Sequence, residues 1–176
     1  MNIEFQISEA LKLFNQKDYR NAALAFENIT ILLKETNLHL KYAEICNNAS
    51  VAYLLAGNPE KAFEFANNTH IIFEKENDFK NAGLALGNQA AALEELGDRN
   101  KAFDLYQKAA EFLENAGEKE SRAYILKRIS SLQIRKGDHV NALGSMTSAL
   151  QNLPNLTARE KMLKKLSSII SKLGNN

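Results

Sequence analysis

GNPEKAF at residues 57–63 returns as GDRNKAF at 97–103 and as GDHVNAL at 137–143, so one short pattern recurs at a spacing of 40 residues. One period earlier, KDYRNAA at 17–23 keeps the pattern but has Lys17 in place of the glycine. Self-similarity at such a fixed spacing is typical of repeat proteins, in which each unit packs against its neighbours. The pattern therefore predicts four units, near residues 3–36, 37–76, 77–116 and 117–154.

Each column of the repeat fits a helix boundary. The glycine readily adopts the left-handed conformation that ends a helix. The Asp or Asn that follows can accept hydrogen bonds from the free N–H groups of the next helix, and so predicts an N-cap. These caps are Asp18, Asn58, Asp98 and Asp138. Four residues after each cap stands an alanine, at 22, 62, 102 and 142, which indicates a close approach of two helices.

Between these boundaries, apolar residues recur every three or four positions, as Leu86, Ala90 and Leu93 do, which is the spacing of an amphipathic helix. The predicted helices lie near 3–16, 19–35, 38–56, 59–76, 79–96, 99–116, 119–136 and 139–152. A further helix at about 158–173 follows a capping box of Thr157 and Glu160. We expect this capping segment, 157–173, to cover the exposed face of the last unit.

The predicted fold class is therefore all-α. We expect a right-handed α-solenoid of four helical hairpins plus a C-terminal capping helix, forming a single domain over residues 1–176. Two prolines and eight glycines give too little turn chemistry for a β-sandwich or barrel.

Composition and charge exclude several functions. The 22 basic and 21 acidic residues nearly balance, whereas a nucleic-acid partner normally requires a basic excess on one face. No stretch approaches the ~18 apolar residues of a membrane span. The start, Met1–Phe5, lacks the pattern of a signal peptide, and the single Cys46 fits a reducing compartment. We therefore expect a cytoplasmic protein with neither a nucleic-acid nor a membrane partner.

No group of residues predicts catalysis. His39, His70 and His139 fall in three different helices, without the spacing of a metal site. Gly83 and Gly87 lie inside a helical pattern, where they favour close packing over phosphate binding. No nucleophile, base and orienting acid stand together. The sequence therefore predicts no enzyme, no cofactor and no metal.

The pattern resembles that of the tetratricopeptide repeat family, whose first helix carries a large residue, a Leu-Gly pair and a tyrosine, and whose second helix carries an alanine and a large residue, with a proline near the end. Unit two matches with Cys46, Ala49-Ser50, Tyr53, Ala62 and Ala66, unit three with Leu86, Gln89-Ala90, Leu93, Ala102 and Tyr106, and unit four with Leu126, Ile129-Ser130, Gln133, Ala142, Met146 and Pro154. Because the period exceeds the family's basic 34 residues, the chain is most similar to the longer repeats of the spindle-orientation adaptor, of kinesin light chains and of bacterial peptide-sensing regulators.

In this family the first helix of each hairpin lines a concave groove, where an extended or helical peptide commonly lies. The resemblance therefore implies four sets of groove residues: Glu4, Ile7, Ser8, Leu11 and Asn15; Glu44, Asn47, Asn48, Val51 and Leu55; Leu84, Asn88, Ala91 and Glu95; and Tyr124, Lys127, Arg128, Ser131 and Arg135.

Asn48 and Asn88 are the sharpest candidates for binding. An asparagine amide offers donors and an acceptor, so it can pair with a peptide backbone in both directions, and the family often places asparagine at this position. The alternative is that each side chain bonds a neighbouring helix instead.

Lys127, Arg128 and Arg135 could hold an acidic side chain or a terminal carboxylate. Charge runs on helices are more often solvated faces, so we favour a solvated face for these three residues.

Two hypotheses of function remain. The first is a scaffold or adaptor that binds a protein or peptide partner in the groove. The second is a structural module that forms a homo-oligomer or docks inside a larger complex without a peptide ligand.

Overall fold

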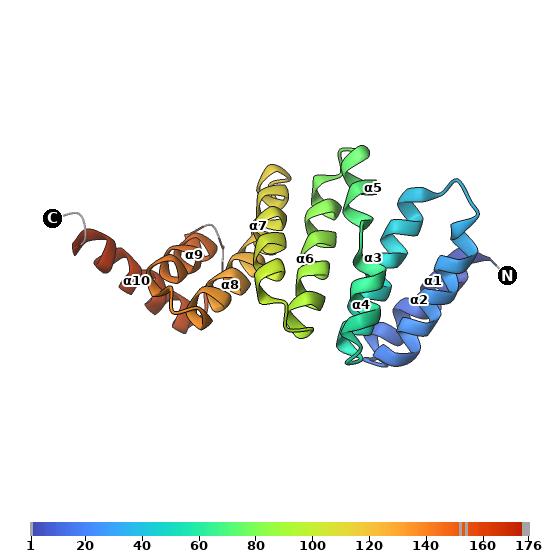
Figure 1. Ribbon diagram of the computed structural model, residues 1–176, viewed down its shortest axis with the longest axis horizontal. Coiled ribbons are helices and arrows are strands. Elements are labelled where there is room, and N and C mark those ends of the chain that lie inside the picture. The colour runs from blue at the N-terminus through green and yellow to red at the C-terminus, as the bar shows by residue number, and fades with distance from the viewer. Residues whose placement is uncertain (1, 152, 154, 174–176) are drawn as a thin grey trace.

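The computed structural model describes residues 2–151, 153 and 155–173, and for residues 168–173 it describes the backbone alone. The helices in this part of the chain are α1 (Ile3–Asn15), α2 (Tyr19–Lys34), α3 (His39–Leu55), α4 (Pro59–Ala66), α5 (Thr69–Lys75), α6 (Phe79–Glu95), α7 (Arg99–Asn115), α8 (Lys119–Arg135), α9 (His139–Gln151) and α10 (Ala158–Leu173). They follow one another along the long axis of the molecule, with the two termini at opposite ends (Figure 1). The predicted all-α solenoid is confirmed.

The predicted caps begin the second helices of the hairpins. The side chains of Asp18, Asn58 and Asp98 accept hydrogen bonds from the backbone N–H three residues later, at 3.4, 3.0 and 3.2 Å. Asp138 accepts the same bond at 3.3 Å. These bonds satisfy donors that have no partner within the helix, so the cap positions set where each helix starts.

The glycine that opens each copy of the repeated pattern follows the end of a first helix, as predicted. Gly57 has a φ of +79°, and Gly97 and Gly137 have φ of +88° and +81°. Lys17, which replaces the glycine in the first unit, keeps this left-handed conformation with a φ of +64°. Because the left-handed region is costly for a residue with a Cβ atom, the turn of the first hairpin carries local strain that the glycine turns of the other three hairpins avoid.

Small residues bring the helices together. Ala22, Ala62 and Ala102 are fully buried. A Cβ atom on Gly83 would lie 2.7 Å from a Leu113 side-chain carbon, which confirms that this glycine permits close packing.

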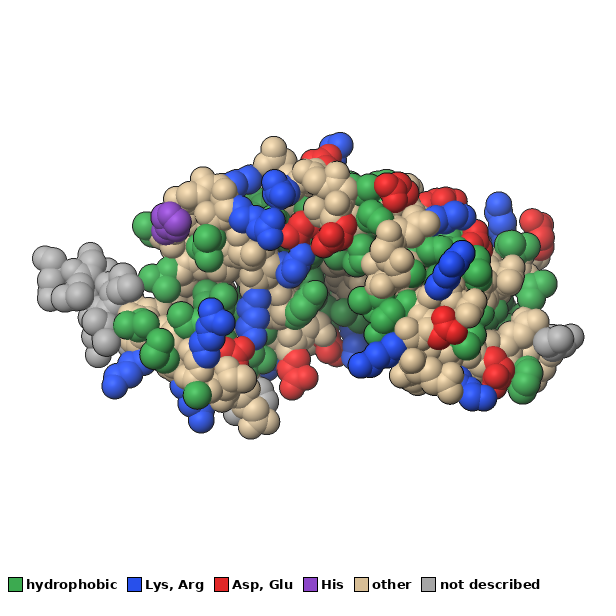
Figure 2. Space-filling view, turned by 90° about the horizontal axis from the view of Figure 1, so that it is seen from below, with side chains coloured by type: hydrophobic (Ala, Val, Ile, Leu, Met, Phe, Trp, Pro, Cys, Tyr) green, Lys and Arg blue, Asp and Glu red, His purple; other side chains and the backbone are tan. Residues whose placement is uncertain are grey.

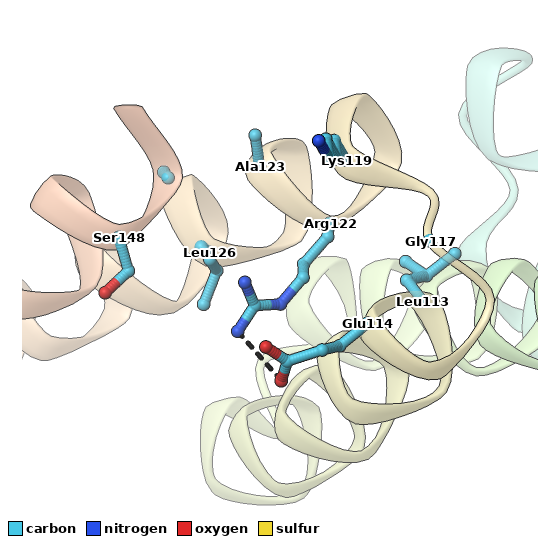
Figure 3. A pocket seen from close by; sticks show the side chains of 9 residues that line it. Leu113, Glu114, Gly117, Lys119, Arg122, Ala123, Leu126 and Ser148 are labelled. Atoms are coloured by element: carbon cyan, nitrogen blue, oxygen red, sulfur yellow. Dashed lines mark ion pairs between the residues drawn. The ribbon is translucent and has the colours of Figure 1, made fainter. Parts of the chain in front are cut away.

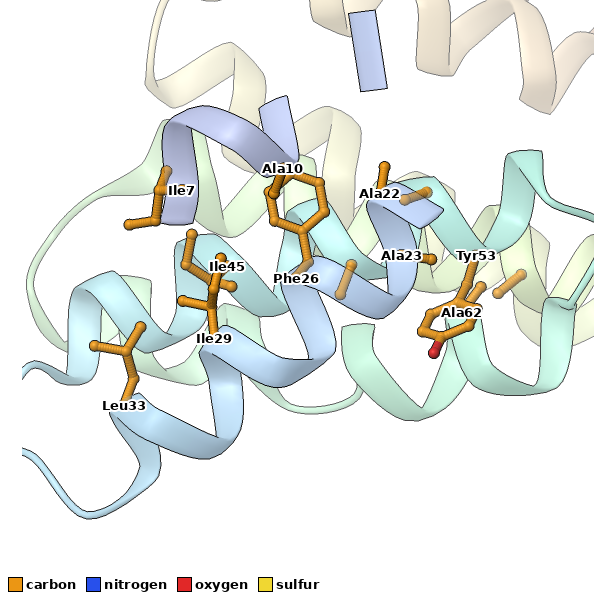
Figure 4. Close-up of a cluster of buried hydrophobic side chains, with 13 residues drawn as sticks. Ile7, Ala10, Ala22, Ala23, Phe26, Ile29, Leu33, Ile45, Tyr53 and Ala62 are labelled. Carbon is orange, nitrogen blue, oxygen red and sulfur yellow. The ribbon is translucent and has the colours of Figure 1, made fainter. Parts of the chain in front are cut away.

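The core is divided among neighbouring units. Figure 4 shows the N-terminal cluster, in which Phe26, Ile29 and Leu33 of α2 meet Ile45 of α3. A second cluster, centred on Tyr106 of α7, joins α6, α7 and α8. Each cluster contains residues from adjacent helices in the chain, as a solenoid requires.

The helix predicted at 59–76 was wrong, because two helices occupy this stretch. Asn67 is extended and Asn68 is left-handed, with a φ of +62°, so α4 ends and α5 starts in a new direction. Side chains stabilise the break: the Thr69 hydroxyl donates to Asn47 Oδ1 at 3.1 Å, and Gln89 Nε2 donates to Asn67 Oδ1 at 3.0 Å. Asparagine tolerates the left-handed region better than most residues, which explains why two asparagines stand here.

The C-terminal helix begins with the predicted capping box. The Thr157 backbone N–H donates to Glu160 Oε2 at 2.9 Å, and the Glu160 N–H donates to Thr157 Oγ1 at 3.3 Å. The helix packs on α9 at the end of the molecule (Figure 1). Pro154, the proline of the fourth unit, lies outside the described residues.

Candidate functional site

The central hollow of the molecule lies between α3, α5 and α6 and has a volume of about 380 Å³. It is lined by Glu44, Asn47, Asn48, Val51, Phe73, Asn81, Leu84 and Asn88. Six of these are among the predicted groove candidates: Glu44, Asn47, Asn48, Val51, Leu84 and Asn88. Two adjacent first helices therefore present their predicted groove residues to one shared space.

Two further hollows follow the same first-helix positions. One, on α1, is lined by Glu4, Ile7, Ser8, Leu11, Lys12, Asn15 and Gln16 and includes all the groove candidates of the first unit. The other, of about 280 Å³, includes Tyr124 and Lys127 of α8 and extends to Leu153 and Asn155 after α9. The other six groove candidates lie outside these three hollows: Leu55, Ala91, Glu95, Arg128, Ser131 and Arg135.

Two asparagine amides remain available in the central hollow. Asn48 and Asn88 are half-buried, and within the described part of the chain neither side chain forms a hydrogen bond. Val51 and Leu84 stand beside them, and Phe73 closes the space with a side chain that is itself buried. The combination of free amides and apolar walls suits a peptide, whose backbone needs hydrogen bonds and whose side chains need apolar contacts.

Asn47 lines the hollow with a side chain that is already engaged within the chain. This side chain is buried, and its Oδ1 accepts the hydrogen bond from Thr69 that stabilises the α4–α5 break. Asn47 therefore contributes to the structure of the wall, and a role for it in binding stays a prediction.

Sequence reasoning missed two lining residues, Phe73 and Asn81. Phe73 lines the hollow because α5 starts in a new direction after the break at Asn67 and Asn68. The sequence analysis did not predict this break. Asn81 belongs to the first turn of α6, where its Nδ2 donates to Asp78 Oδ2 at 2.7 Å. The asparagine pair followed by a β-branched threonine was the signal that could have located the turn.

The cations of α8 are mostly engaged within the chain. Lys127 Nζ lies 2.5 Å from Glu160 Oε1 of α10, and a guanidinium nitrogen of Arg128 lies 2.6 Å from Glu94 Oε2 of α6. The solvated-face interpretation therefore fails for these two residues, which tie three helices together. Arg135 is exposed and forms no ion pair with any described residue.

The contact between α8 and α10 also affects the pKa of Glu160. The hydrogen bond from Lys127, followed by those from the Thr157 backbone and hydroxyl, lowers the pKa of Glu160 to about 2. The carboxylate is therefore charged at neutral pH, and the contact persists far into the acidic range.

The capping helix leaves the central hollow open. α10 packs on α9, and its ion pair reaches α8, whereas the lining of the central hollow comes from α3, α5 and α6 alone. Among the described residues, no helix is long and apolar enough to cross a membrane, and no three metal-binding side chains come together.

Stacked helical hairpins with an amide-bearing hollow define a tetratricopeptide-like repeat protein. The family model of the soluble NSF attachment protein, SNAP, matches residues 6–165, and the chain belongs to this family. Among curated proteins, none matches.

Solved structures support the same fold. The chain is similar to BtubC (BKLC) from P. vanneervenii, with a TM-score of 0.71, 14% identity, and coverage of 98% of this chain and 85% of that chain. It is also similar to a kinesin-light-chain-type protein of Podospora anserina with nearly identical TPR-like repeats, with a TM-score of 0.74, 12% identity, and coverage of 97% and 87%. At these identities the likeness concerns the fold alone, and it confirms the resemblance to the repeats of kinesin light chains.

Proposed function

We propose that this protein is a non-catalytic scaffold that holds a peptide or a helix of a partner protein in the central hollow. Repeat proteins of this kind generally mediate contacts between proteins, and the SNAP family is itself named for attachment to another protein. The observation that carries the proposal is the pair of unbonded amides of Asn48 and Asn88 beside apolar Val51 and Leu84.

The energetics of the hollow favour a protein ligand. A half-buried amide without a partner gains little from the chain itself, but it can both donate to and accept from a peptide backbone. Phe73 and Leu84 give side chains of the ligand an apolar surface. Because Asn48 and Asn88 lie on adjacent first helices, α3 and α6, one extended or helical segment can meet both amides.

Removal of both amides tests the proposal. A phage-displayed peptide library is selected on the wild-type chain, and a selected peptide is titrated by fluorescence anisotropy. The double variant Asn48→Ala/Asn88→Ala should raise its Kd about tenfold, since each lost hydrogen bond contributes on the order of 1 kcal/mol. The thermal midpoint should stay close to that of the wild type, because neither amide bonds another part of the described chain.

The matched control is Asn28→Ala/Asn100→Ala, which removes two exposed amides on α2 and α7 that lie outside the hollow. It should leave the Kd unchanged. If both double variants bind the peptide as the wild type does, the central hollow is not the binding site.

A second candidate function, self-assembly, is favoured by the apolar surface of the first unit. Phe5 on α1 and Ile31 on α2 leave 57% and 64% of their surface exposed. Exposed apolar side chains of this size often contribute to contacts between proteins. Light scattering should then show a mass that rises with concentration, and Ile31→Lys should restore the monomer. A monomer mass at every concentration would exclude this candidate.

A further inference from the structure

A separate cavity of about 130 Å³ lies between α7, α8 and α9, away from the central hollow (Figure 3). It is lined by Leu113, Glu114, Gly117, Lys119, Arg122, Ala123, Leu126, Ser148 and Ala149. Neither the groove candidates nor the proposed function involves these residues.

The preceding unit fills the equivalent space with apolar side chains. Forty residues before Lys119 and Arg122 stand Phe79 and Ala82, on the first turn of α6. Ala82 is fully buried, and the ring of Phe79 packs on that of Phe112 with a centroid distance of 6.0 Å. The fourth unit has replaced an aromatic residue and a buried alanine with two cations.

The second helix of the fourth unit also stops early. α7 runs from Arg99 to Asn115, whereas α9 starts 40 residues later, at His139, but ends at Gln151. Leu153 and Asn155, the counterparts of Leu113 and Asn115 at the end of α7, are not helical, and the cavity lies between α7, α8 and α9.

The arginine that lines this cavity has a buried polar atom without a partner. Arg122 Nε is buried and bonds no described residue, although another guanidinium nitrogen of Arg122 lies 3.0 Å from Glu114 Oε2. Figure 3 shows the Arg122 side chain extending from α8 toward Glu114 on α7. Glu114 is largely exposed, so its carboxylate neutralises the guanidinium from the solvent side and leaves the inner N–H unused.

A buried N–H group without an acceptor costs free energy, and a guanidinium gains most from a carboxylate. Apolar walls formed by Leu113, Leu126 and Ala149 face the rest of the space. At about 30 Å³ for each water, the cavity has room for roughly four water molecules, which corresponds to a group of about four to six heavy atoms.

We propose that this cavity binds a carboxylate carried on a short aliphatic stem. The carboxylate pairs with the guanidinium of Arg122, whose side chain lines the cavity, Lys119 at the cavity wall adds positive charge, and the stem contacts Leu113 and Leu126. Two sources share this chemistry: a free short-chain acid, and the C-terminal residue of a polypeptide that ends in a small aliphatic side chain.

Glu114 competes with such a ligand for Arg122. Removal of its charge should therefore strengthen binding, which is the opposite of what happens when a residue that merely stabilises the fold is lost. The same change at Glu111, one turn earlier on α7 and exposed without an ion pair, provides a matched control.

The experiment follows the Arg122 Nε–H signal by ¹H–¹⁵N NMR in the full chain. Sodium isobutyrate is titrated at constant ionic strength against sodium chloride, and sodium phosphate is titrated in parallel. The signal should shift saturably with isobutyrate only. Glu114→Gln should lower the Kd about threefold, a change typical of an exposed ion pair, whereas Glu111→Gln should leave it unchanged.

A second variant keeps the test decisive. Lys119→Phe/Arg122→Ala restores the residues of the preceding unit and should fold at least as stably as the wild type. The backbone amide of Ala123 should respond to isobutyrate in the wild type and not in this variant. A tripeptide that ends in alanine, with a free or an amidated C-terminus, distinguishes the two sources: a response to the free form alone identifies a chain end as a ligand.

Three results would overturn the proposal. The first is the absence of a saturable shift with both isobutyrate and the free tripeptide. The second is an equal response to phosphate, which would show a general anion effect. The third is weaker binding in Glu114→Gln. None of these results bears on the central hollow, because Asn48 and Asn88 lie outside this cavity.

Discussion

Single residues in the turns differ in the conformational free energy that their left-handed backbone costs. Gly57 and Lys17 occupy equivalent positions with φ of +79° and +64°, but only the glycine adopts this conformation without steric cost. No atom lies within 4 Å of a Cβ built on Gly57, so the requirement for glycine comes from the backbone and not from crowding.

Reciprocal substitutions should therefore have opposite effects. Gly57→Ala should lower the free energy of unfolding by about 1 to 2 kcal/mol, whereas Lys17→Gly should raise it by up to about 1 kcal/mol. Urea unfolding followed by circular dichroism measures both. A destabilising effect of Lys17→Gly would show that the lysine side chain contributes more than the backbone strain costs.

A carboxylate between the first two units makes stability depend on pH. Glu27 accepts hydrogen bonds from Tyr53 and, at 2.7 Å, from Lys61. Burial raises the pKa of Glu27, but the bonds from Lys61 and Tyr53 outweigh it and hold the pKa below the ordinary 4.5. A depressed pKa in the folded state stabilises the fold above the unfolded value, and this contribution is lost as the pH falls.

Glu27→Gln should therefore lower the free energy of unfolding by about 1 kcal/mol at pH 7. The difference from the wild type should shrink as the pH falls below 4.5, where the wild-type carboxylate becomes protonated. Urea unfolding at a series of pH values measures this difference, with the exposed Glu111→Gln on α7 as the control. A difference that is constant between pH 7 and pH 3 would contradict the assigned charge state.

At the scale of the helices, the break between α4 and α5 depends on Thr69. Its hydroxyl donates toward Asn47 Oδ1 at 3.1 Å and toward the Ala66 carbonyl at 2.9 Å. Thr69→Val keeps the shape but leaves the buried acceptor of Asn47 without a donor, so we expect a loss of about 1 to 3 kcal/mol in urea unfolding. Thr147→Val removes a hydroxyl that bonds only the carbonyl of Leu143 in its own helix, and it should have a much smaller effect.

The docking of α10 depends on Glu160, which joins the capping box to Lys127 of α8. Glu160→Gln should increase amide hydrogen exchange throughout α10, while exchange in α6 and α7 stays unchanged. Because Lys127 and Thr157 lower the pKa of Glu160 to about 2, wild-type α10 should remain protected at pH 4. Loss of that protection near pH 4 would refute the role of this ion pair.

Helix positions could largely be predicted from the sequence because caps and glycines act locally. Asp98 and Gly117 alone nearly determine the bounds of α7. The break at Asn67 and Asn68 escaped prediction because the hydrogen bonds that stabilise it come from Asn47 and Gln89, 22 residues away along the chain in each case.

The resemblance to tetratricopeptide repeats implied groove positions for Asn48 and Asn88, and both line the central hollow. Their role in binding stays a prediction. The repeat pattern gave no information on whether a side chain is already engaged, which is why Arg128 was assigned to a solvated face. Its partner, Glu94, belongs to another helix, and only the packing of α6 against α8 brings the two charges together.

At the scale of the whole molecule, charge is distributed unevenly. Residues 1–116 contain 17 acidic and 11 basic side chains, whereas residues 117–176 contain 4 acidic and 11 basic ones. Basic side chains gather on the C-terminal half of the face shown in Figure 2, while both signs mix on the N-terminal half. The near-neutral total therefore conceals a strongly polarised molecule. Only the first three units lack the basic excess that an anionic partner requires.

The division of the core into separate clusters predicts which helices unfold locally when one cluster is weakened. Phe26 belongs to the N-terminal cluster, which has no member in α8 or α9. Phe26→Ala should cost about 3 to 5 kcal/mol and should increase hydrogen exchange in α1, α2 and α3, with little change in α8 and α9. Mass spectrometry of exchanged peptides can resolve these segments. A uniform increase along the chain would indicate a single cooperative unit.

The interruption at Asn67 and Asn68 also has a mechanical consequence. A continuous helix resists bending through its ladder of backbone hydrogen bonds, and in the second hairpin this ladder is interrupted between α4 and α5, where Asn67 is extended and Asn68 is left-handed. Phe73, which lies beyond the interruption, forms part of the wall around the two amides. We therefore expect this pair of residues to act as a hinge. A bulky ligand would then widen the central hollow by rotating α5, while the spacing of the other hairpins stays unchanged.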